Sequence, residues 1–251
     1  MVLSCTVSRV TELRGPAFYA LRPGGWRDLV TILHPPYTAW HLSYVAIGAA
    51  VAPEFHLDRL LAALAGFFLA VGISAHALDE LNGRPLGTRL SDATLIAVAA
   101  VGLCGAVGIG IAGLAIVSLS LAPFVAAGAF IVLAYNLELF GGRFHTDLWF
   151  AAAWGAFPAA TGYWVEALEV EPAGVLAVVG CFALSVAQRR LSAPVRELRR
   201  RTLSVRGEQR LAGGEVVELT PGRLAAPLDG ALRALSLAMV ALAAGLVAFR
   251  L

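Results

Sequence analysis

The stretch ISAHALDELNGRPLGT, residues 73–88, places one histidine, two acids and one arginine at the end of a long apolar run. On a helix, His76 and Glu80 share one face and Asp79 lies close to it. Such a group could bind a metal ion, or hold a phosphorylated substrate through Mg²⁺. The acids could instead form a solvated helix end. Acids at a helix C-terminus oppose the macrodipole at about 0.3–1 kcal/mol each, so we expect a compensating metal ion or Arg84 nearby.

Further polar side chains stand at the ends of other apolar runs. They are His34 and His41, then Tyr135, Asn136 and Glu138, then His145 and Asp147, and finally Gln188, Arg189 and Arg190. Ionisable groups at membrane depth are costly and normally face a cavity or a partner. We therefore expect these groups to converge. For His34 the alternative is an interfacial cap before the Pro-Pro pair, and for His41 it is a buried histidine held by hydrogen bonds.

The elements that position these residues are membrane-spanning helices. The chain has 251 residues, of which 59% are hydrophobic and 14% charged, with a mean hydropathy of +0.76. A helix needs about 20 mostly apolar residues to cross a membrane. Seven such runs lie near 37–53, 60–80, 92–112, 115–137, 147–165, 172–190 and 227–250. Open sheets are excluded at this depth, so we predict an all-α, polytopic transmembrane bundle of about seven helices.

Arginine positions predict the orientation of this bundle. Most basic residues fall in four places: Arg9, Arg14, Arg22 and Arg27; Arg84 and Arg89; Arg143; and Arg189, Arg190, Arg196 and Arg199 to Arg201. If the seven runs are spans, all four places lie on one side. The positive-inside rule makes that side cytoplasmic, and we expect an integral protein of the cell inner membrane with a cytoplasmic N-terminus. The run from Arg199 to Arg201 is explained by this rule and by lipid headgroups.

The chain divides into two predicted regions. Residues 1–33 form an N-terminal cytoplasmic segment, which is either an amphipathic surface helix or a disordered tail. Residues 34–251 form the transmembrane helical domain, with a cytoplasmic excursion near 191–226. Within that excursion, SVRGEQRLAGGEVVELTPGRL has glycine-rich turn signals between two short alternating stretches, which predicts a small hairpin or an extended segment.

Several segments resemble the UbiA superfamily of intramembrane prenyltransferases. HPPYTAWHLSYVAIGAAVAP resembles the first helix of that family and GFFLAVGISAHALDELNGRPLGT the second, which ends in an acidic motif. VLAYNLELFGGRFHTDLWFAAAWGAFPAATGYW is similar to the fourth and fifth helices. The resemblance covers about 34–190. On the first acidic motif only Glu80 keeps a carboxylate, with Asp79 beside it. The place of the second acidic motif reads AQRRLSAPVRELRRR, which contains no aspartate.

The resemblance implies transfer of an isoprenoid group from its diphosphate to a lipid-like acceptor at a cytoplasm-facing cleft. Mg²⁺ would be held by Asp79 and Glu80. The implied catalytic residues are Asp79, Glu80, Tyr135 and Asn136, and the implied substrate-binding residues are Arg84, Arg89, Arg189, Arg190 and Trp154. The arginines would take over diphosphate charge that a second metal ion meets in the family.

Two alternatives follow from the substituted residues. The set His41, His76, Asp79, Glu80, Glu138 and His145 offers mixed nitrogen and oxygen ligands, which suit Fe, Mn or Zn. Such a site would oxidise, desaturate or hydrolyse a lipid. Alternatively, the protein is a non-enzymatic binder of a lipid or a quinone. In each case we expect an isoprenoid or lipid ligand and membrane lipids as partners, with no nucleic acid. No pattern indicates an oligomeric state.

Overall fold

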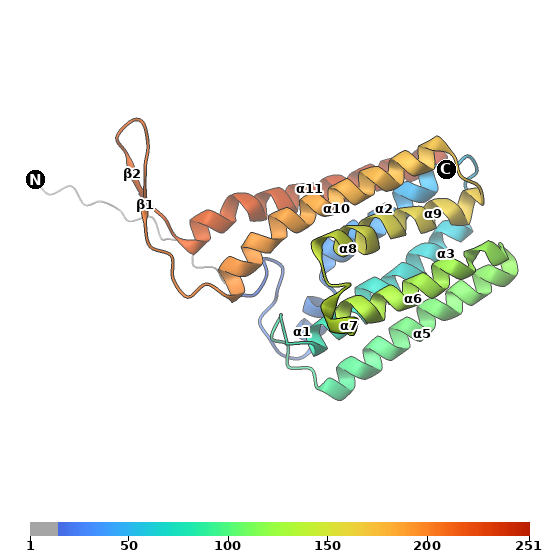
Figure 1. The fold of residues 1–251 in the computed structure, drawn as a ribbon, viewed down its shortest axis with the longest axis horizontal. Helices are drawn as coiled ribbons and strands as arrows, with labels where there is room; N and C mark the ends of the chain where they lie inside the picture. Colours follow the sequence, from blue (N-terminus) through green and yellow to red (C-terminus); the bar gives the residue numbers. More distant parts are fainter. Residues whose placement is uncertain (1–14) are drawn as a thin grey trace, which may run out of the picture.

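The computed structural model describes residues 15–251, so Arg9 and Arg14 lie outside the described range. The described chain is mostly helical, and its long segments run alongside one another (Figure 1). The elements are α1 (Trp26–Ile32), α2 (Pro35–Ala50), α3 (Leu57–Phe67), α4 (His76–Leu81), α5 (Asp92–Ile116), α6 (Ala122–Asn136), α7 (Leu139–Gly142), α8 (Asp147–Ala151), α9 (Phe157–Ala167), α10 (Pro172–Arg200) and α11 (Pro221–Arg250). A short 3₁₀ turn, Leu119–Leu121, precedes α6.

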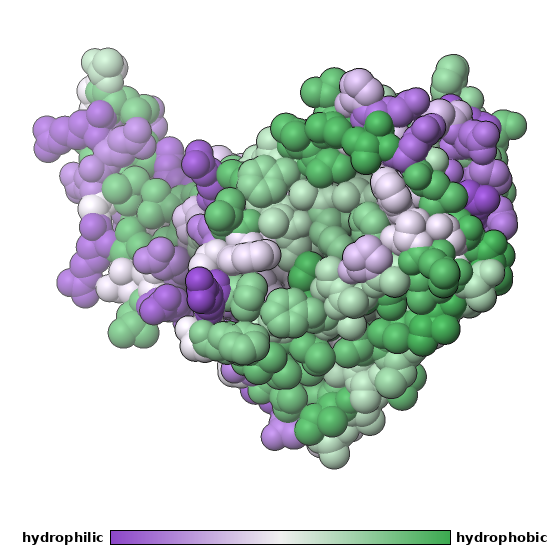
Figure 2. Space-filling view, turned by 45° about the vertical axis from the view of Figure 1, so that its right-hand side comes forward, coloured by the Kyte–Doolittle hydropathy of each residue, from purple (hydrophilic) through white to green (hydrophobic). Residues whose placement is uncertain are grey.

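Five helices in the described range are long and apolar enough to cross a membrane. They are Leu57–Leu81, Asp92–Ile116, Leu119–Asn136, Pro172–Arg200 and Pro221–Arg250. The predicted helical character and the presence of helices able to span a membrane are therefore confirmed. The count of seven spans is not, because α2 and the segment 147–167 are absent from this set. Figure 2 shows hydrophilic residues gathered at the two ends of the molecule and hydrophobic residues between them, as a membrane-embedded surface requires.

Two of the long segments contain π-helical turns. The segment Phe68–Ala75 joins α3 to α4, and the segment Ala152–Ala156 joins α8 to α9. Such wide turns leave carbonyl groups available to side chains and occur often at functional sites. Here they lie directly before His76 and around Trp154.

Helix α2 lies at the centre of the bundle and packs most closely on α9. A Cβ atom added at Gly48 would lie 2.1 Å from the Ala159 carbonyl oxygen, and one added at Gly162 would lie 2.1 Å from that of Val45. The two glycines therefore permit backbone contact between the helices, as small residues do in membrane proteins. This contact fixes where the side chains near the start of α2 point.

The polar connections group at the two ends of the bundle. Residues 15–34, the 81–91 loop, α7 and the connection between α10 and α11 lie at one end in Figure 1, and the C-terminus lies at the other. The predicted arginine-rich segments in the described range therefore share one end. Which end faces the cytoplasm stays a prediction.

The excursion between the last two helices is shorter than the predicted 191–226. Helix α10 continues to Arg200, and α11 begins at Pro221, where Thr220 caps it by accepting from the Arg223 amide. Between them, β1 (Glu208–Arg210) pairs antiparallel with β2 (Val216–Glu218), with Gln209 opposite Val217. The last turns of α10 carry polar side chains along one face. A search for apolar runs therefore does not include these turns in the predicted span.

Candidate functional site

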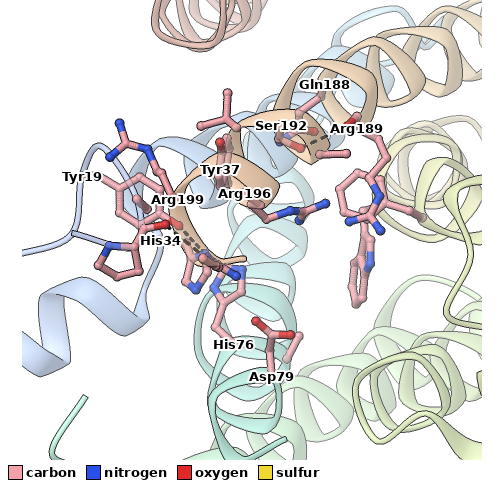
Figure 3. A pocket seen from close by; sticks show the side chains of 18 of the residues that line it. Tyr19, His34, Tyr37, His76, Asp79, Gln188, Arg189, Ser192, Arg196 and Arg199 are labelled. Carbon is pink, nitrogen blue, oxygen red and sulfur yellow. Dashed lines mark hydrogen bonds between the residues drawn. The ribbon is translucent and has the colours of Figure 1, made fainter. Parts of the chain in front are cut away.

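A cavity of about 530 Å³ opens at the arginine-rich end of the bundle. It lies between the start of α2, the turn into α4, the polar end of α10 and residues 16–19 (Figure 3). The charged and histidine side chains lining it are His34, His41, His76, His145, Asp79, Glu197, Asp229, Arg189, Arg196, Arg199, Arg200 and Arg201. Four of the five histidines in the sequence thus meet in one cavity, as their positions at helix ends predict.

Three of these histidines are held in the same way. The Nδ1–H group of His41 donates to the Trp154 carbonyl at 2.7 Å, that of His76 to the Gly72 carbonyl at 3.3 Å, and that of His145 to the Tyr135 carbonyl at 3.1 Å. Two of the carbonyls, those of Gly72 and Trp154, belong to the π-helical segments. In a neutral imidazole that donates from Nδ1, Nε2 is the acceptor nitrogen.

His34 is held differently and is more than a helix cap. It is the N-cap residue of α2 with left-handed backbone angles (φ 45°, ψ 55°), and its side chain makes no capping hydrogen bond. Its Nδ1 shares a hydrogen bond with the Tyr19 hydroxyl at 2.7 Å, and its ring stacks on His76 at 4.1 Å. The buried Nε2 atom has no hydrogen-bond partner among the described residues. Burial, followed by the neighbouring His76, lowers the pKa of His34 well below its ordinary value.

One face of α10 supplies the polar wall opposite α4. Gln188, Ser192 and Arg196 are spaced four residues apart and all line the cavity, and Arg189 lies beside them. In Figure 3 the Arg196 side chain extends from α10 into the cavity, between Arg189 and His76. Sequence reasoning selected Arg189 and missed Arg196. The four-residue spacing from Gln188 would have found it if α10 had been extended beyond residue 190.

The adjacent acids Asp79 and Glu80 point to different places. Asp79 lines the cavity and makes no hydrogen bond or ion pair with any described residue. The Glu80 side chain is fully buried away from the cavity and accepts from the Leu86 amide at 2.9 Å and the Thr88 amide at 2.7 Å. The Thr88 hydroxyl also donates to it at 2.8 Å. In this structure Glu80 is therefore placed to hold the 81–91 loop, and it does not face the cavity.

Several other predicted site residues also lie outside the cavity. Arg84 pairs with Asp92 and donates to the Leu90 carbonyl at 2.5 Å. The Arg89 amide donates to Asp28, and its side chain does not line the cavity. Arg190 is exposed on the other side of α10. Glu138 is an exposed residue whose carboxylate lies 3.9 Å from His145 Nδ1.

The remaining predicted residues line the cavity. Tyr135 stacks on His145 with ring centroids 4.5 Å apart, and Trp154 meets Tyr135 edge to face at 5.5 Å. Asn136 also lines the cavity. Its side-chain amide donates to the Val132 carbonyl, and its backbone carbonyl accepts from the Asn82 side-chain amide. Arg189 forms an ion pair with Asp147, with Nε and Oδ1 2.6 Å apart. The cavity therefore has an aromatic wall as well as a basic one.

The side chains predicted to bind a metal ion are not gathered around one point in the described residues. Among residues 15–251 there is no group of three or more His, Cys, Asp or Glu side chains placed to share an ion. Glu80 is turned to the 81–91 loop, and Asp229 pairs with Arg199 at 2.5 Å. Asp79 is the one lining carboxylate of the described range that is neither exposed nor paired. The residues present therefore fit poorly to Mg²⁺ or to Fe, Mn or Zn, and a bound metal stays a prediction.

A second, apolar groove of about 420 Å³ lies beside the cavity. Val71 and Trp154 line both spaces, so the two are adjacent there. The groove runs between α3, α5, α6 and α9, and its lining is almost entirely aliphatic or aromatic, including Phe67, Phe124 and Phe157. Its far end reaches Asp58 and Arg59, at the opposite end of α3 from the cavity. A polar space and an apolar space thus lie side by side in the bundle.

No protein-family model, curated protein or solved structure matches this chain. The resemblance to the UbiA superfamily therefore rests on the short motifs alone.

Proposed function

We propose that the protein is an intramembrane prenyltransferase of UbiA-like type, which transfers an isoprenoid group from its diphosphate to a lipid-like acceptor. The observation that carries this proposal is that a basic cavity and an apolar groove lie side by side and share Val71 and Trp154 in their linings. An isoprenoid diphosphate has the same two parts, an anionic head and a long apolar tail. Ligand sites in membrane bundles commonly lie between helices with this mixed character.

The residues of the cavity suit the charges that develop during transfer. The bond between the allylic carbon and the diphosphate oxygen breaks, and the diphosphate leaves with the electron pair. Arginines of α10 would stabilise that leaving charge, as fixed cations do for phosphoryl groups. The aromatic faces of Tyr135 and Trp154 would stabilise the allylic cation. The acceptor then bonds to the allylic carbon, and its proton passes to the Asp79 carboxylate.

The test is formation of product in lipid vesicles. Purified protein is incubated with geranyl, farnesyl or geranylgeranyl diphosphate and a membrane lipid extract, and mass spectrometry searches for a lipid that has gained one prenyl group. We expect product and released pyrophosphate with wild type and with Arg190→Gln, whose side chain lies outside the cavity. We expect neither with Asp79→Asn. Absence of product with all three diphosphates would contradict the proposal.

A second candidate is a non-enzymatic binder of an anionic lipid. The observation favouring it is that, within residues 15–251, Asp79 is the one unpaired and partly buried carboxylate lining the cavity, where the family resemblance implies two acidic motifs. In that case the diphosphates would bind in the cavity and stay intact. The oxidation alternative requires several side chains at one shared ion, and the described residues contain no such group.

A further inference from the structure

We propose that the cavity binds the diphosphate of its substrate directly through arginines of α10, with Arg196 at the centre, and without a bridging metal ion. This inference rests on the proposed function, because it names how the head of the isoprenoid substrate is recognised. Three observations support it: an imbalance of charge, an arginine without a partner, and buried polar atoms that lack hydrogen bonds.

The charge around the cavity is basic. Five arginines line it, namely Arg189, Arg196, Arg199, Arg200 and Arg201, against the three carboxylates of Asp79, Glu197 and Asp229. Two of the arginines have carboxylate partners, since Arg189 pairs with Asp147 and Arg199 with Asp229. An excess of positive charge in a recess attracts anions.

Arg196 is the arginine best placed to meet such an anion. It makes no hydrogen bond or ion pair with any residue in the described part of the chain, although its side chain is partly buried. Arg189 on one side pairs with Asp147 at 2.6 Å and lies over the Phe150 ring at 5.3 Å. On the other side, Arg200 donates to the Pro16 carbonyl at 3.3 Å. A guanidinium group presents paired donors that match phosphate oxygens, so two or three such groups can surround a diphosphate.

Two residues that line the cavity carry buried polar atoms without partners. Nε2 of His34 and Oε1 of Gln188 are buried and make no hydrogen bond within the described structure. Buried polar atoms are normally satisfied, so unpaired atoms on residues that line one cavity favour a ligand or ordered water there. Gln188 and Arg196 lie on the same face of α10, so one ligand could reach both.

The carboxylates explain why a metal ion is not needed in this arrangement. Mg²⁺ is usually held by one or two carboxylates together with substrate phosphates. Glu80 is committed to the Leu86 and Thr88 amides, and Asp229 to Arg199. Asp79 alone is left on the α4 side. The charge that metal ions would neutralise is therefore met by arginine, from the helix where the resemblance implies a second acidic motif.

The test measures binding of inorganic pyrophosphate to the full chain in detergent by calorimetry, once with EDTA and once with excess Mg²⁺. We expect similar affinity in both conditions. Arg196→Gln should weaken binding on the order of 10- to 100-fold, because a charge-assisted hydrogen bond is lost. Arg190→Gln on the same helix should bind like wild type. Binding that requires Mg²⁺, or unchanged binding by Arg196→Gln, would overturn the proposal.

Two further measurements separate this inference from the proposed function. Arg196→Lys keeps the charge but not the paired donors, so we expect an affinity between those of wild type and Arg196→Gln; circular dichroism confirms that each variant is folded. Farnesyl thiodiphosphate, which resists ionisation, should bind more tightly than pyrophosphate because its tail enters the groove. Equal affinity for pyrophosphate and farnesyl thiodiphosphate would contradict the isoprenoid assignment but not the binding of diphosphate by the arginines. Equal displacement of pyrophosphate by phosphatidate and by farnesyl thiodiphosphate would assign the site to phospholipid headgroups instead.

Discussion

The 81–91 loop and the cavity differ in how completely their polar groups are paired. In the loop, Glu80 accepts three hydrogen bonds and Asp28 accepts from the Gly24 and Arg89 amides. In the cavity, Asp79 and Arg196 have neither hydrogen bonds nor ion pairs with described residues, and His34 Nε2 is buried without a partner. Buried groups that satisfy one another stabilise a fold, whereas unsatisfied groups around a recess indicate a ligand. The difference separates structural acids from candidate functional ones, although Asp79 and Glu80 are neighbours in sequence.

The largest effect is expected from breaking the paired region. Glu80→Gln keeps the size of the side chain but replaces one acceptor oxygen with a donor, which leaves buried amides of the loop unsatisfied. We expect the free energy of unfolding to fall by about 2–4 kcal/mol, measured by denaturant titration in detergent. Glu138→Gln, at an exposed position, is the matched control and should change stability by less than about 0.5 kcal/mol. Normal stability combined with lost pyrophosphate binding in the presence of Mg²⁺ would instead assign Glu80 to a metal ion that binds the pyrophosphate.

Acid should weaken the cavity region through His34. Its pKa is lowered in the folded protein by burial, so below about pH 6.5 the unfolded chain binds a proton that the folded chain does not. The stability present at neutral pH should therefore fall as the pH decreases below 6.5, by at most about 1.4 kcal/mol per pH unit from this one group. Thermal unfolding of wild type and His34→Gln across this range measures the difference, and the variant should show the shallower slope. Identical slopes would contradict a neutral, buried His34.

Asp79→Asn tests the charge of the cavity. Removal of a negative charge near Arg196 should tighten pyrophosphate binding by about three- to tenfold, because the carboxylate repels the anion. Stability should change little, since the Asp79 carboxylate makes no hydrogen bond or ion pair with described residues. Calorimetry with pyrophosphate checks the first expectation and thermal unfolding the second. Weaker binding of pyrophosphate in the presence of Mg²⁺ would show that Asp79 holds a metal ion.

The smallest effect is expected for Arg84→Gln. Its ion pair with Asp92 lies at the surface, where the Asp92 side chain is 70% exposed, and such pairs contribute about 0.2–1 kcal/mol. We expect a loss of stability within that range and unchanged affinity for pyrophosphate. A clear loss of pyrophosphate affinity, measured by calorimetry, would instead show that Arg84 binds the substrate, as the family resemblance implies.

The sequence was sufficient to predict the helical membrane character and the meeting of four histidines. Long apolar runs specify helices, and antiparallel neighbours bring alternate helix ends together, so His41, His76 and His145 had to approach one another. The directions of the Asp79 and Glu80 side chains were harder to predict. Both lie near the His76 face, but positions three and four residues away lie on opposite flanks of a helix, about 100° apart. Only the packing around α4 decides that the cavity lies on the flank of Asp79 and the loop on the flank of Glu80.

Arg196 was missed for a related reason. The apolar criterion ends the sixth run at residue 190, because the following residues are too polar to face lipid. Within the bundle, the same residues continue α10 with a polar face directed at the cavity. The positive-inside rule explains the run from Arg199 to Arg201 by itself. The same explanation covers Arg196, three residues earlier, so the sequence offered no separate reason to assign Arg196 to a site.

The π-helical segments before His76 and around Trp154 carry an evolutionary consequence. A wide turn accommodates an extra residue compared with a regular α-helix. Deletion of one residue within Phe68–Ala75 would remove that extra residue and allow an unbroken α-helix to form, so the segments on either side would keep their relative orientation. The carbonyl groups of the wide turn would return to regular helical hydrogen bonds, and His76 would lose the Gly72 carbonyl as the acceptor of its Nδ1–H group. A single-codon deletion would thus change how His76 is held while the apolar length of the span stayed almost the same, and a single-codon insertion in an ancestral helix would have had the opposite effect.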